Sequence, residues 1–316
     1  MHNRFLFYYL RFSKTRIEEK GTGSTFKSVN KGILEGFVLP VPPLLEQRAI
    51  AHVLRTVQRA KEATERVIAA LKELRKSLMR HLFTYGPVPV DQVDQVPLKE
   101  TEIGPLPEGW KVTQVGDVFE IQQGKALSPK ARNGPRQRPF LRTANVLWGR
   151  IDLSALDSMH FEESEEERLA LRCGDLLVCE GGDIGRTAVW EGQVSPCFYQ
   201  NHLHRLRSPR ADLEPRFYMY WMEIAWTMLG LYGGAGNRTT IPNLSRSRLA
   251  SFSVPLSPFP EQRAIAEIVR GVDRKIEAEE NRKAALDALF KTLLHHLMTG
   301  KVRVGGVVSG ASEAKA

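Results

Sequence analysis

A hexapeptide that occurs twice is the feature that most constrains this chain of 316 residues. The string Glu-Gln-Arg-Ala-Ile-Ala stands at residues 46–51 and again at residues 261–266. Each copy follows a proline-rich run and opens a long helical pattern, and the two patterns close on His-Leu-Phe-Thr at 81–84 and His-Leu-Met-Thr at 296–299. A six-residue match alone is weak evidence, but the same match in the same larger context indicates a duplicated module.

Two long helices are predicted, from about Leu44 to Thr84 and from about Pro260 to Thr299. In the first, residues recur with alternating spacings of four and three, which is a heptad seam: Val53, Val57, Ala60, Thr64, Val67, Leu71, Leu74 and Leu78. The second has a similar seam around a polar middle at 279–283: Ile268, Val272, Ile276, Leu286, Leu289, Leu293 and Leu297. Each helix would be roughly 60 Å long. Because no small domain covers such a helix all round, we expect the two to pair as an antiparallel coiled coil.

The sequence between the two predicted helices indicates a globular α+β unit. All five tryptophans and all three cysteines lie between residues 110 and 226. Short strands separated by turn signals are expected at Val115–Ile121, Pro139–Ala144, Asp175–Cys179 and Thr187–Trp190. An apolar helix is expected over 215–232, a strand within 241–255, and a further short strand over 36–41 that ends at the first prolines.

The charge balance favours a polyanionic partner. The formal net charge is +9 and the pI is about 9.5. Residues 121–150 hold seven basic and no acidic residues, whereas residues 151–167 hold seven acidic and no basic ones. This segregation predicts a local electric field that a net charge alone would not.

Other signals bear on the compartment. Cys173, Cys179 and Cys197 are too few for a disulfide framework and suit reduced thiols in a cytoplasm. The apolar stretches are too short to span a membrane, and the start of the chain does not read as a signal peptide. We therefore expect a cytoplasmic protein with no membrane partner.

Several strings in order resemble one family. Leu-Pro-Glu-Gly-Trp at 106–110 opens the globular unit, Gly-Asp-Leu-Leu-Val at 174–178 and the glycine-rich run at 181–186 form its middle, and Asn-Leu-Ser at 243–245 precedes the second proline run. Followed by the repeated Glu-Gln-Arg and a long helix, this order resembles the specificity subunit of type I restriction-modification systems. The resemblance covers residues 106–300, with a partial second match over residues 1–86.

The resemblance implies a non-catalytic reader of double-stranded DNA. Its partners would be two type I methyltransferase (modification) subunits and a restriction (motor-nuclease) subunit, and the methyl donor would belong to the methyltransferase, so no cofactor is expected here. It implies the following division: a remnant of a first target recognition domain at 1–43, a first spacer helix at 44–86, a linker at 87–105, a complete recognition domain at 106–258, a second spacer helix at 259–300 and a disordered tail at 301–316.

The chain departs from the family pattern in its first copy. A full subunit carries two complete recognition domains, whereas here the first has only about its last forty residues. The aromatic string at 5–10 aligns with the string at 217–222. A shortened gene, a misassigned start and a reduced form that self-associates through its helices are all compatible with this pattern.

No catalytic set is evident in the sequence. A methyltransferase needs a glycine-rich donor site and an Asn/Asp-Pro-Pro-Tyr motif, and neither occurs. The glycine runs at 181–185 and 233–236 lack the lysine of a phosphate-binding loop, so tight turns are favoured. Cys173 and Cys179 have no partners at zinc spacing, which favours buried thiols and no metal site.

DNA contact is the chemistry that the residues fit. Lys and Arg neutralise phosphates, whereas Arg, Asn and Thr can also read base edges. For phosphate contact we expect a basic Gly/Pro-rich loop with Lys125, Lys130, Arg132, Arg136 and Arg138. For base readout the candidates are Arg142, Thr143, Asn145, Arg186, Thr187, Asn237, Arg238 and Thr239, with surface salt bridges to the acidic run as an equally weighted alternative.

Two other functions stay open from the sequence. An adaptor or non-functional form would bind the methyltransferase without directing methylation, and the shortened first domain favours it. An enzyme in its own right is a third possibility, because missing motifs are weak evidence.

Overall fold

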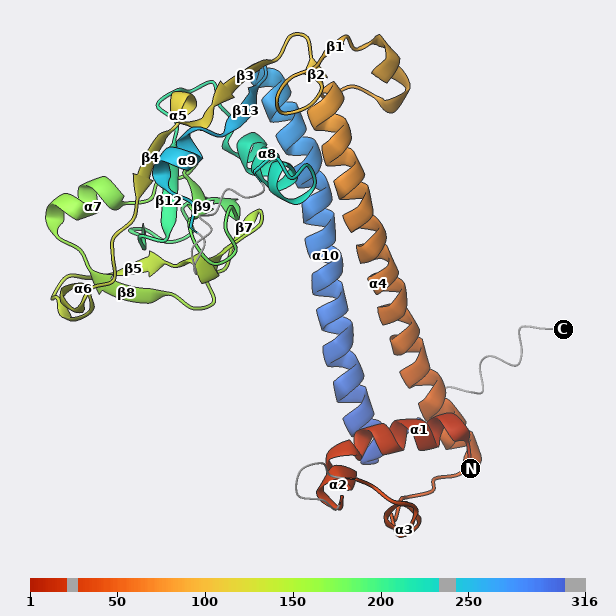
Figure 1. The fold of residues 1–316 in the computed structure, drawn as a ribbon. Coiled ribbons are helices and arrows are strands. Elements are labelled where there is room, and N and C mark those ends of the chain that lie inside the picture. Colours follow the sequence, from red (N-terminus) through yellow and green to blue (C-terminus); the bar gives the residue numbers. More distant parts are fainter. Residues whose placement is uncertain (22–27, 233–242, 305–316) are drawn as a thin grey trace. The chain divides into compact units, whose positions relative to one another are not determined.

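The computed structural model describes residues 1–21, 28–232 and 243–304. It divides into two compact units, which we call unit 1 (Met1–Glu73 and Asp273–Ala316) and unit 2 (Leu74–Val272). Each unit contains the beginning of one long helix and the end of the other, together with its own smaller elements (Figure 1). None of the helices in the described part of the chain is long and apolar enough to cross a membrane.

The two predicted long helices are present. They are α4 (Leu44–Tyr85) and α10 (Phe259–Met298), within two residues of the expected bounds. Neither is interrupted by a proline beyond its first turn, and each is followed by a glycine at positive φ, Gly86 at 79° and Gly300 at 69°. Glycine adopts this left-handed conformation without a steric penalty, and it therefore ends the helix.

The heptad period is confirmed, but the seam differs from the predicted one. On α4 the buried and half-buried positions run through Leu54, Val57, Lys61, Thr64, Ile68, Leu71, Arg75 and Leu78, so half of the predicted positions are shifted by one residue. Val67 and Leu74, which were expected in the seam, are exposed, and so are Ile268 and Leu289 on α10. Apolar character misled the prediction because the long stems of Lys61 and Arg75 occupy seam positions.

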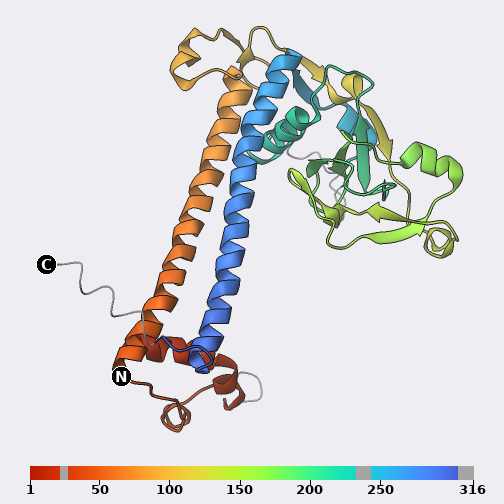
Figure 2. The same cartoon turned by 180° about the vertical axis from the view of Figure 1, so that it is seen from behind.

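Within unit 1 the two helices run antiparallel (Figures 1 and 2). Lys61 forms an ion pair with Asp287, Lys283 lies 3.0 Å from Glu65, and Lys72 lies 2.8 Å from Glu280. The residue number rises along α4 as it falls along α10, which fixes the direction. The hydrogen bond from Lys61 lowers the pKa of Asp287.

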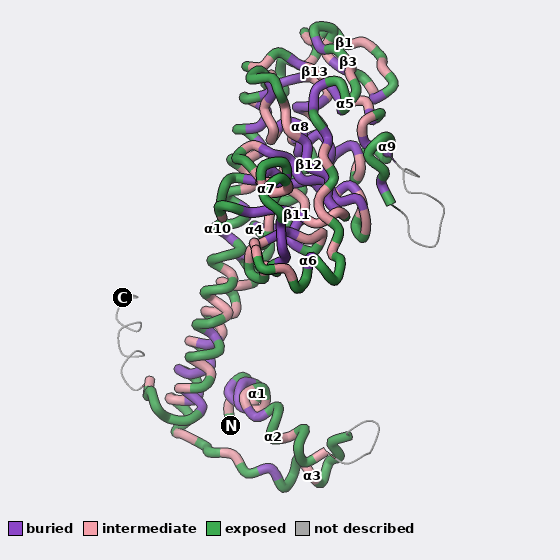
Figure 3. Tube along the Cα trace, turned by 90° about the vertical axis from the view of Figure 1, so that its left-hand side faces the viewer, coloured by how far each residue is buried: buried purple, intermediate pink, exposed green. Residues whose placement is uncertain are grey.

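Three short helices accompany the long pair in unit 1: α1 (Asn3–Phe12), α2 (Lys14–Glu19) and α3 (Lys31–Glu35). Helix α1 packs on the beginning of α4 and the end of α10 through a shared core of Phe5, Tyr8, Tyr9, Phe37, Ile50, Leu54, Phe290, Leu297 and Met298. Helices α2 and α3 bury no residues, as the tube in Figure 3 shows. Residues 36–41, where a short strand was predicted, are not part of a strand in the described structure.

Unit 2 contains the α+β body. Its largest sheet has the order β10-β9-β12-β4, and a three-stranded sheet has the order β11-β5-β8. The strands are β4 (Glu120–Gln123), β5 (Gln137–Leu141), β8 (Asp157–His160), β9 (Leu176–Cys179), β10 (Thr187–Val189), β11 (Phe198–Tyr199) and β12 (Leu203–Arg207). The predicted strand at 115–121 is wrong in its first half, because residues 115–118 form the short helix α5 (Val115–Val118).

Smaller elements complete unit 2. Strand β3 (Lys111–Gln114) pairs antiparallel with β13 (Ser253–Leu256), which leads into α10. The remaining elements are η1 (Val90–Gln95), β1 (Leu98–Lys99), β2 (Leu106–Pro107), α6 (Pro129–Asn133), η2 (Thr143–Asn145), β6 (Val146–Leu147), β7 (Arg150–Ile151), α7 (Glu163–Leu169), α8 (Pro215–Thr227) and α9 (Arg246–Ala250).

Two apolar cores hold the body together. The first contains Trp110, Phe119, Phe217, Trp221 and Val254, so it joins the body to α8 and to the ends of the long helices in unit 2. A second core, including Phe140, Phe161, Trp190, Phe198 and Tyr199, lies between the two sheets. The first core therefore packs the body against α8, and the second core positions the outer loops of the body.

The repeated hexapeptide has the same structural role in both units. The buried glutamine of each copy forms hydrogen bonds at two places. One is the chain just before the long helix, and the other is the start of a short helix. Gln47 Nε2 donates to the Pro42 carbonyl at 2.7 Å, and its Oε1 accepts from the backbone N–H of His2 at 2.8 Å. Gln262 donates to the Ser257 carbonyl at 2.7 Å and accepts from the N–H of Glu214 at 2.9 Å.

The glutamate beside each glutamine holds the segment that follows the opposite long helix. In unit 1 the Glu46 carboxylate accepts two hydrogen bonds from Arg303, at 3.1 and 2.8 Å, which lowers the pKa of Glu46. In unit 2 Glu261 accepts from the indole Nε1–H of Trp110 at 2.7 Å. Residues 301–304, which were predicted to begin a disordered tail, are therefore tied to α4, while 305–316 lie outside the described residues.

Candidate nucleic-acid interface

The predicted basic loop lies against the acidic run that follows it in sequence. Helix α7 carries that run and is closed at its start by a capping box between Glu162 and Glu165. Four of its carboxylates pair with the predicted DNA-contacting cations: Lys125 with Glu165, Lys130 with Glu162 at 3.1 Å, Arg136 with Glu163 at 3.7 Å and with Glu166 at 3.4 Å, and Arg138 with Glu166 at 2.9 Å. The segregation in the sequence is thus cancelled in space, which corrects the expected local field.

The carboxylates of this network are held ionised. A hydrogen bond from Lys130 lowers the pKa of Glu162. Burial acts to raise the pKa of Glu165 and Glu166, but hydrogen bonds from Lys125 and from Arg138 outweigh it and lower both. Lys125 also lies over the ring of Phe161 at 5.2 Å, so its ammonium is used inside the body rather than held out to a ligand.

Two of the predicted cations stand apart from this network. Arg132 on α6 is exposed, and no carboxylate of the described residues forms an ion pair with it. Arg142 lies at the end of β5, where its guanidinium is 3.1 Å from the Asp157 carboxylate. Both side chains reach solvent, and an exposed ion pair such as that of Arg142 costs little to exchange for a phosphate.

Two segments far apart in the sequence meet at the end of the four-stranded sheet where β9 turns into β10. Arg186 Nη2 donates to the Thr143 carbonyl at 3.3 Å, and Arg186 Nη1 lies 3.2 Å from the Asp183 carboxylate. Arg142 adjoins Thr143. We call the group Arg142, Thr143, Asp183 and Arg186 the β9–β10 rim. The structure thus brings together three of the predicted base-reading residues from segments far apart in the sequence.

The glycines of the β9–β10 turn are structural, as the sequence indicated. Gly182 and Gly185 have φ values of 71° and 84°. A Cβ atom on Gly185 would lie 2.3 Å from the ring of Trp226, so only glycine fits there. Below the turn, burial raises the pKa of the Cys179 thiol to about 12, although Arg186 opposes that rise.

Two of the predicted base readers are used inside the body. The side chain of Asn145 is buried, accepts from the N–H of Arg142 at 2.8 Å and donates to the carbonyls of Asp152 and Ala155. The Thr187 hydroxyl is buried and donates to the Gly185 carbonyl at 2.8 Å. Neither side chain is available to a base, so both are better explained as supports of the rim. Asn237, Arg238 and Thr239 lie outside the described residues.

The sequence did not single out a buried polar network beside the rim. Gln123 Nε2 donates to Glu180 Oε2 at 2.6 Å, and His204 Nε2 donates to the Leu244 carbonyl at 2.8 Å while lying 3.8 Å from Glu180. Burial lowers the pKa of His204. The backbone N–H of Leu244 donates to the Glu180 carbonyl at 2.8 Å, which anchors the chain just ahead of α9. In the sequence, the signal that could have indicated this network is Glu180, a glutamate that directly follows the apolar strand at 176–179.

Metal and thiol chemistry find little support. Among the described residues, no group of three His, Cys, Asp or Glu side chains could hold a metal ion. Cys179 and Cys197 are buried, whereas Cys173 is exposed, so the expectation of a buried thiol is wrong for Cys173. Its position after the α7 segment, rather than within a strand, accounts for that exposure.

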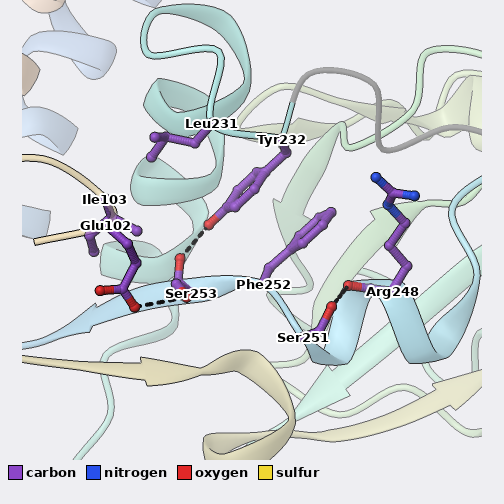
Figure 4. A pocket seen from close by; sticks show the side chains of 8 residues that line it. All are labelled: Glu102, Ile103, Leu231, Tyr232, Arg248, Ser251, Phe252 and Ser253. Carbon is purple, nitrogen blue, oxygen red and sulfur yellow. Dashed lines mark hydrogen bonds between the residues drawn. The ribbon is translucent and has the colours of Figure 1, made fainter.

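A small pocket lies between α8, α9 and the segment before β2 (Figure 4). Its cavity volume is about 220 Å³, and it is lined by Glu102, Ile103, Leu231, Tyr232, Arg248, Ser251, Phe252 and Ser253. The polar groups bond one another: Tyr232 donates to the Ser253 carbonyl at 2.6 Å, and Ser253 Oγ donates to Glu102 at 3.3 Å. Tyr232 stacks on Phe252 with ring centroids 4.0 Å apart. This arrangement is that of a packed junction, in which the polar groups are used by one another.

Two specificity subunits of type I restriction enzymes are similar in sequence to nearly the whole chain. The chain is 26% identical over 319 residues to the type I restriction enzyme MjaVIII specificity subunit of Methanocaldococcus jannaschii, covering 96% of this chain and 71% of that protein. It is 23% identical over 322 residues to the EcoBI specificity subunit of Escherichia coli, covering 95% of this chain and 66% of that protein.

Solved structures support the fold. The S subunit of a type I restriction-modification system from M. genitalium matches with a TM-score of 0.62 at 18% identity, over 94% of this chain and 72% of that chain. The HsdS subunit of Thermoanaerobacter tengcongensis matches with a TM-score of 0.50 at 19% identity, over 96% and 71%. The family model of the type I restriction modification DNA specificity domain matches residues 1–73 and 107–288. The chain therefore belongs to the type I restriction-modification DNA specificity family.

Proposed function

We propose that this chain is the DNA-recognition subunit of a type I restriction-modification complex and reads part of its target site through the body of unit 2. The observation that carries the proposal is the β9–β10 rim, in a domain that matches the specificity family over 107–288. Arginine and threonine are side chains that bind base edges, and at this sheet end the side chain of Arg142 is 40% exposed and that of Arg186 is 17% exposed. The rim supplies positioned donors, as base readout requires.

Phosphate contact would come from cations at the edges of the body. Arg132 is available directly. Lys130 would exchange the exposed Glu162 for a phosphate. Arg136 and Arg138 would exchange the half-buried Glu166. The same exchange would keep non-specific affinity low, because each cation is already paired with a carboxylate when no DNA is bound. The predicted contacts at residues 237–239 remain part of the proposal.

Methylation and cleavage would be carried out by partner subunits. Methyltransferase subunits and a restriction subunit would bind around the long helices, and this chain would supply sequence choice and no catalytic group. Support comes from the specificity-subunit names of the relatives and from a structural neighbour described in terms of complex assembly of the type I system. As a subunit of such a complex, the chain would work in the cytoplasm.

Mapping methylated bases tests this function. Cells that contain the methyltransferase subunits would be sequenced for modified bases with the chain, without it, and with an Arg186→Ala variant. Methylation at one defined sequence only when the unmodified chain is present is the expected result. Methylation that is unchanged by removal of the chain would contradict the proposal and favour an adaptor that does not direct methylation.

A further inference from the structure

A second pocket of unit 2 lies along β4, the end strand of the four-stranded sheet, and we call it the β4 pocket. Its cavity volume is about 420 Å³, which is larger than that of the pocket in Figure 4. Phe119 and Ile121 contribute apolar surface, and the polar lining consists of Glu120, Gln122, Arg205 and Arg246. Two positive side chains and one negative side chain therefore give the lining a net charge of +1.

The close approach of α9 to α5 and β4 brings Arg246 to the pocket (Figure 1). Gly116 on α5 permits that approach, because a Cβ atom there would lie only 3.1 Å from the Cβ of Ala250. Ala250 and Arg246 are one helical turn apart, so they lie on the same side of α9. The contact at Ala250 therefore turns Arg246 toward the β4 pocket, whereas Arg248 on the same helix lines the pocket of Figure 4.

Arg205 brings a buried charge to the same pocket. It stands on β12 opposite Gln122 of β4 and is only 5% exposed. Its Nη1 donates to the Arg168 carbonyl at 2.9 Å, whereas its buried Nε has no hydrogen-bond partner in the part of the chain that the structure describes. A buried guanidinium without a paired charge is costly. An anion in the pocket would supply the charge that Arg205 lacks.

The carboxylates near Arg205 do not balance it. Asp175 accepts two hydrogen bonds from Arg207, at 2.7 and 2.6 Å, so its charge is already used. Glu120 is exposed and forms no ion pair within residues 1–21, 28–232 and 243–304. Within the same ranges, no carboxylate pairs with Arg205 or with Arg246. Burial lowers the pKa of Arg205, which expresses the same cost of an unpaired charge.

We propose that the β4 pocket binds a phosphate group held by Arg205 and Arg246. Guanidinium groups bind phosphate oxygens through parallel hydrogen bonds, and here one comes from a strand and the other from a helix. Gln122 Nε2 donates one hydrogen bond to the Gln123 carbonyl at 2.8 Å and has a second N–H to offer.

The phosphate has two possible sources, the DNA backbone and a free phosphate ion. The net charge of +1 in the lining matches the single negative charge of a phosphodiester, which favours the DNA backbone. That source rests on the function proposed for unit 2, whereas binding of the phosphate group itself does not.

The NMR signal of the Arg205 side-chain N–H in the full chain tests the site. Inorganic phosphate should shift this signal to saturation, whereas chloride or acetate at the same ionic strength should not. Arg246→Ala should weaken phosphate binding by about tenfold, because one of two charged donors is lost. The substitution is at an exposed residue, so the fold should be kept. Arg248→Ala, on the same helix but outside the β4 pocket, is the matched control and should leave phosphate binding unchanged.

An Arg205 signal that phosphate leaves in place would contradict the proposal. An equal shift with chloride or acetate would also contradict it, and so would equal effects of the two substitutions. The titration contains no DNA, so its failure is separate from a failure of the function proposed for unit 2.

Duplex DNA then identifies the source of the phosphate. Fluorescence anisotropy of the complex that contains this chain would be measured at several salt concentrations. If the backbone supplies the phosphate, Arg246→Ala should lower the slope of log K against log salt by about 1 and weaken specific and scrambled duplexes equally. An unchanged slope together with a phosphate response would identify a free phosphate as the ligand of the site.

Discussion

Units 1 and 2 share one arrangement of helices but differ in what is attached to it. Both join the start of one long helix to the end of the other, both seat a short aromatic helix on that junction, and both fix it with the glutamine of the repeated hexapeptide. Only unit 2 carries an α+β body in the described part of the chain. The helix junction is therefore built in the same way in the unit with a body and in the unit without one.

The largest difference in stability between the two units is expected from substitutions at one matched pair of residues, Met219 and Phe7. Met219→Asp would bury an unpaired carboxylate under the body and should lower the free energy of unfolding of unit 2 by about 3–5 kcal/mol. Phe7→Asp, at the matching position of α1, should change the stability of unit 1 by only about 0.5 kcal/mol. Hydrogen exchange in denaturant, read separately on α8 and α1, measures both. Equal losses would show that the outer face of α1 is covered.

The glutamine clamp should matter equally in the two units. Gln47→Ala and Gln262→Ala each remove two hydrogen bonds and leave buried backbone groups unpaired, so each should cost its own unit about 1–3 kcal/mol. Gln→Glu at either position keeps the acceptor oxygen, loses the amide donor and serves as the control. The prediction fails if one clamp proves essential and the other neutral in local exchange measurements.

The β9–β10 rim lies in unit 2, and a substitution there should affect DNA binding. Arg186→Ala should weaken binding of the cognate duplex by the complex by about 1–3 kcal/mol and relax specificity at one position. Arg210→Ala is the matched control, because Arg210 is an exposed arginine paired with Asp212 away from the rim. Fluorescence anisotropy with specific and scrambled duplexes checks this. Equal effects of the two variants would remove Arg186 from the proposed interface.

The acidic helix α7 makes the stability of unit 2 depend on pH. The pKa values of Glu162, Glu165 and Glu166 are lowered from the ordinary value near 4.5. A lowered folded-state pKa means that their contribution is fully present above about pH 4.5 and is lost as the pH falls through the lowered values. Unfolding of unit 2 monitored from pH 6 to pH 3 should show this loss. The triple Glu→Gln variant should show a flatter profile, and an unchanged profile would contradict the account.

The smallest effect is expected at the pairs between the long helices. Lys72 and Glu280 are both about half exposed, so Lys72→Ala should change the stability of unit 1 by only about 0.5 kcal/mol, and less in high salt. Chemical denaturation at two salt concentrations provides the measurement. A larger loss would mean that this pair does more to hold the helices together than its exposure indicates.

The sequence predicted the long helices, their antiparallel pairing and the turn role of the glycines, because period, prolines and glycines act locally. It placed half of the α4 seam wrongly because Lys61 and Arg75 reach the seam through their stems, a feature that an apolar pattern cannot show. It assigned the strand at 36–41 from local character, but a strand exists only with a partner, as the pairing of β13 with β3 shows.

The candidate site was predictable only in part. Arg142, Thr143 and Arg186 are close in space as well as chemically suitable, whereas Asn145 and Thr187 have suitable chemistry but buried side chains. Lys125 and its neighbours were assigned to DNA from a basic run, but tertiary folding sets that run against the acidic residues of α7. Residue type can be read from a sequence, whereas the partner that occupies a charge depends on which segments the fold brings together.

Hydrogen exchange on the unmodified chain, without any partner, tests the central comparison most directly. The amides of residues 253–256 and those of residues 38–41 are matched in sequence context, and each set contains one proline. The account predicts slow exchange at 253–256, where β13 is paired with β3, and fast exchange at 38–41 in the same molecule. Equal protection of the two segments would contradict the claim that unit 1 presents an uncovered counterpart of the site on which unit 2 seats its body.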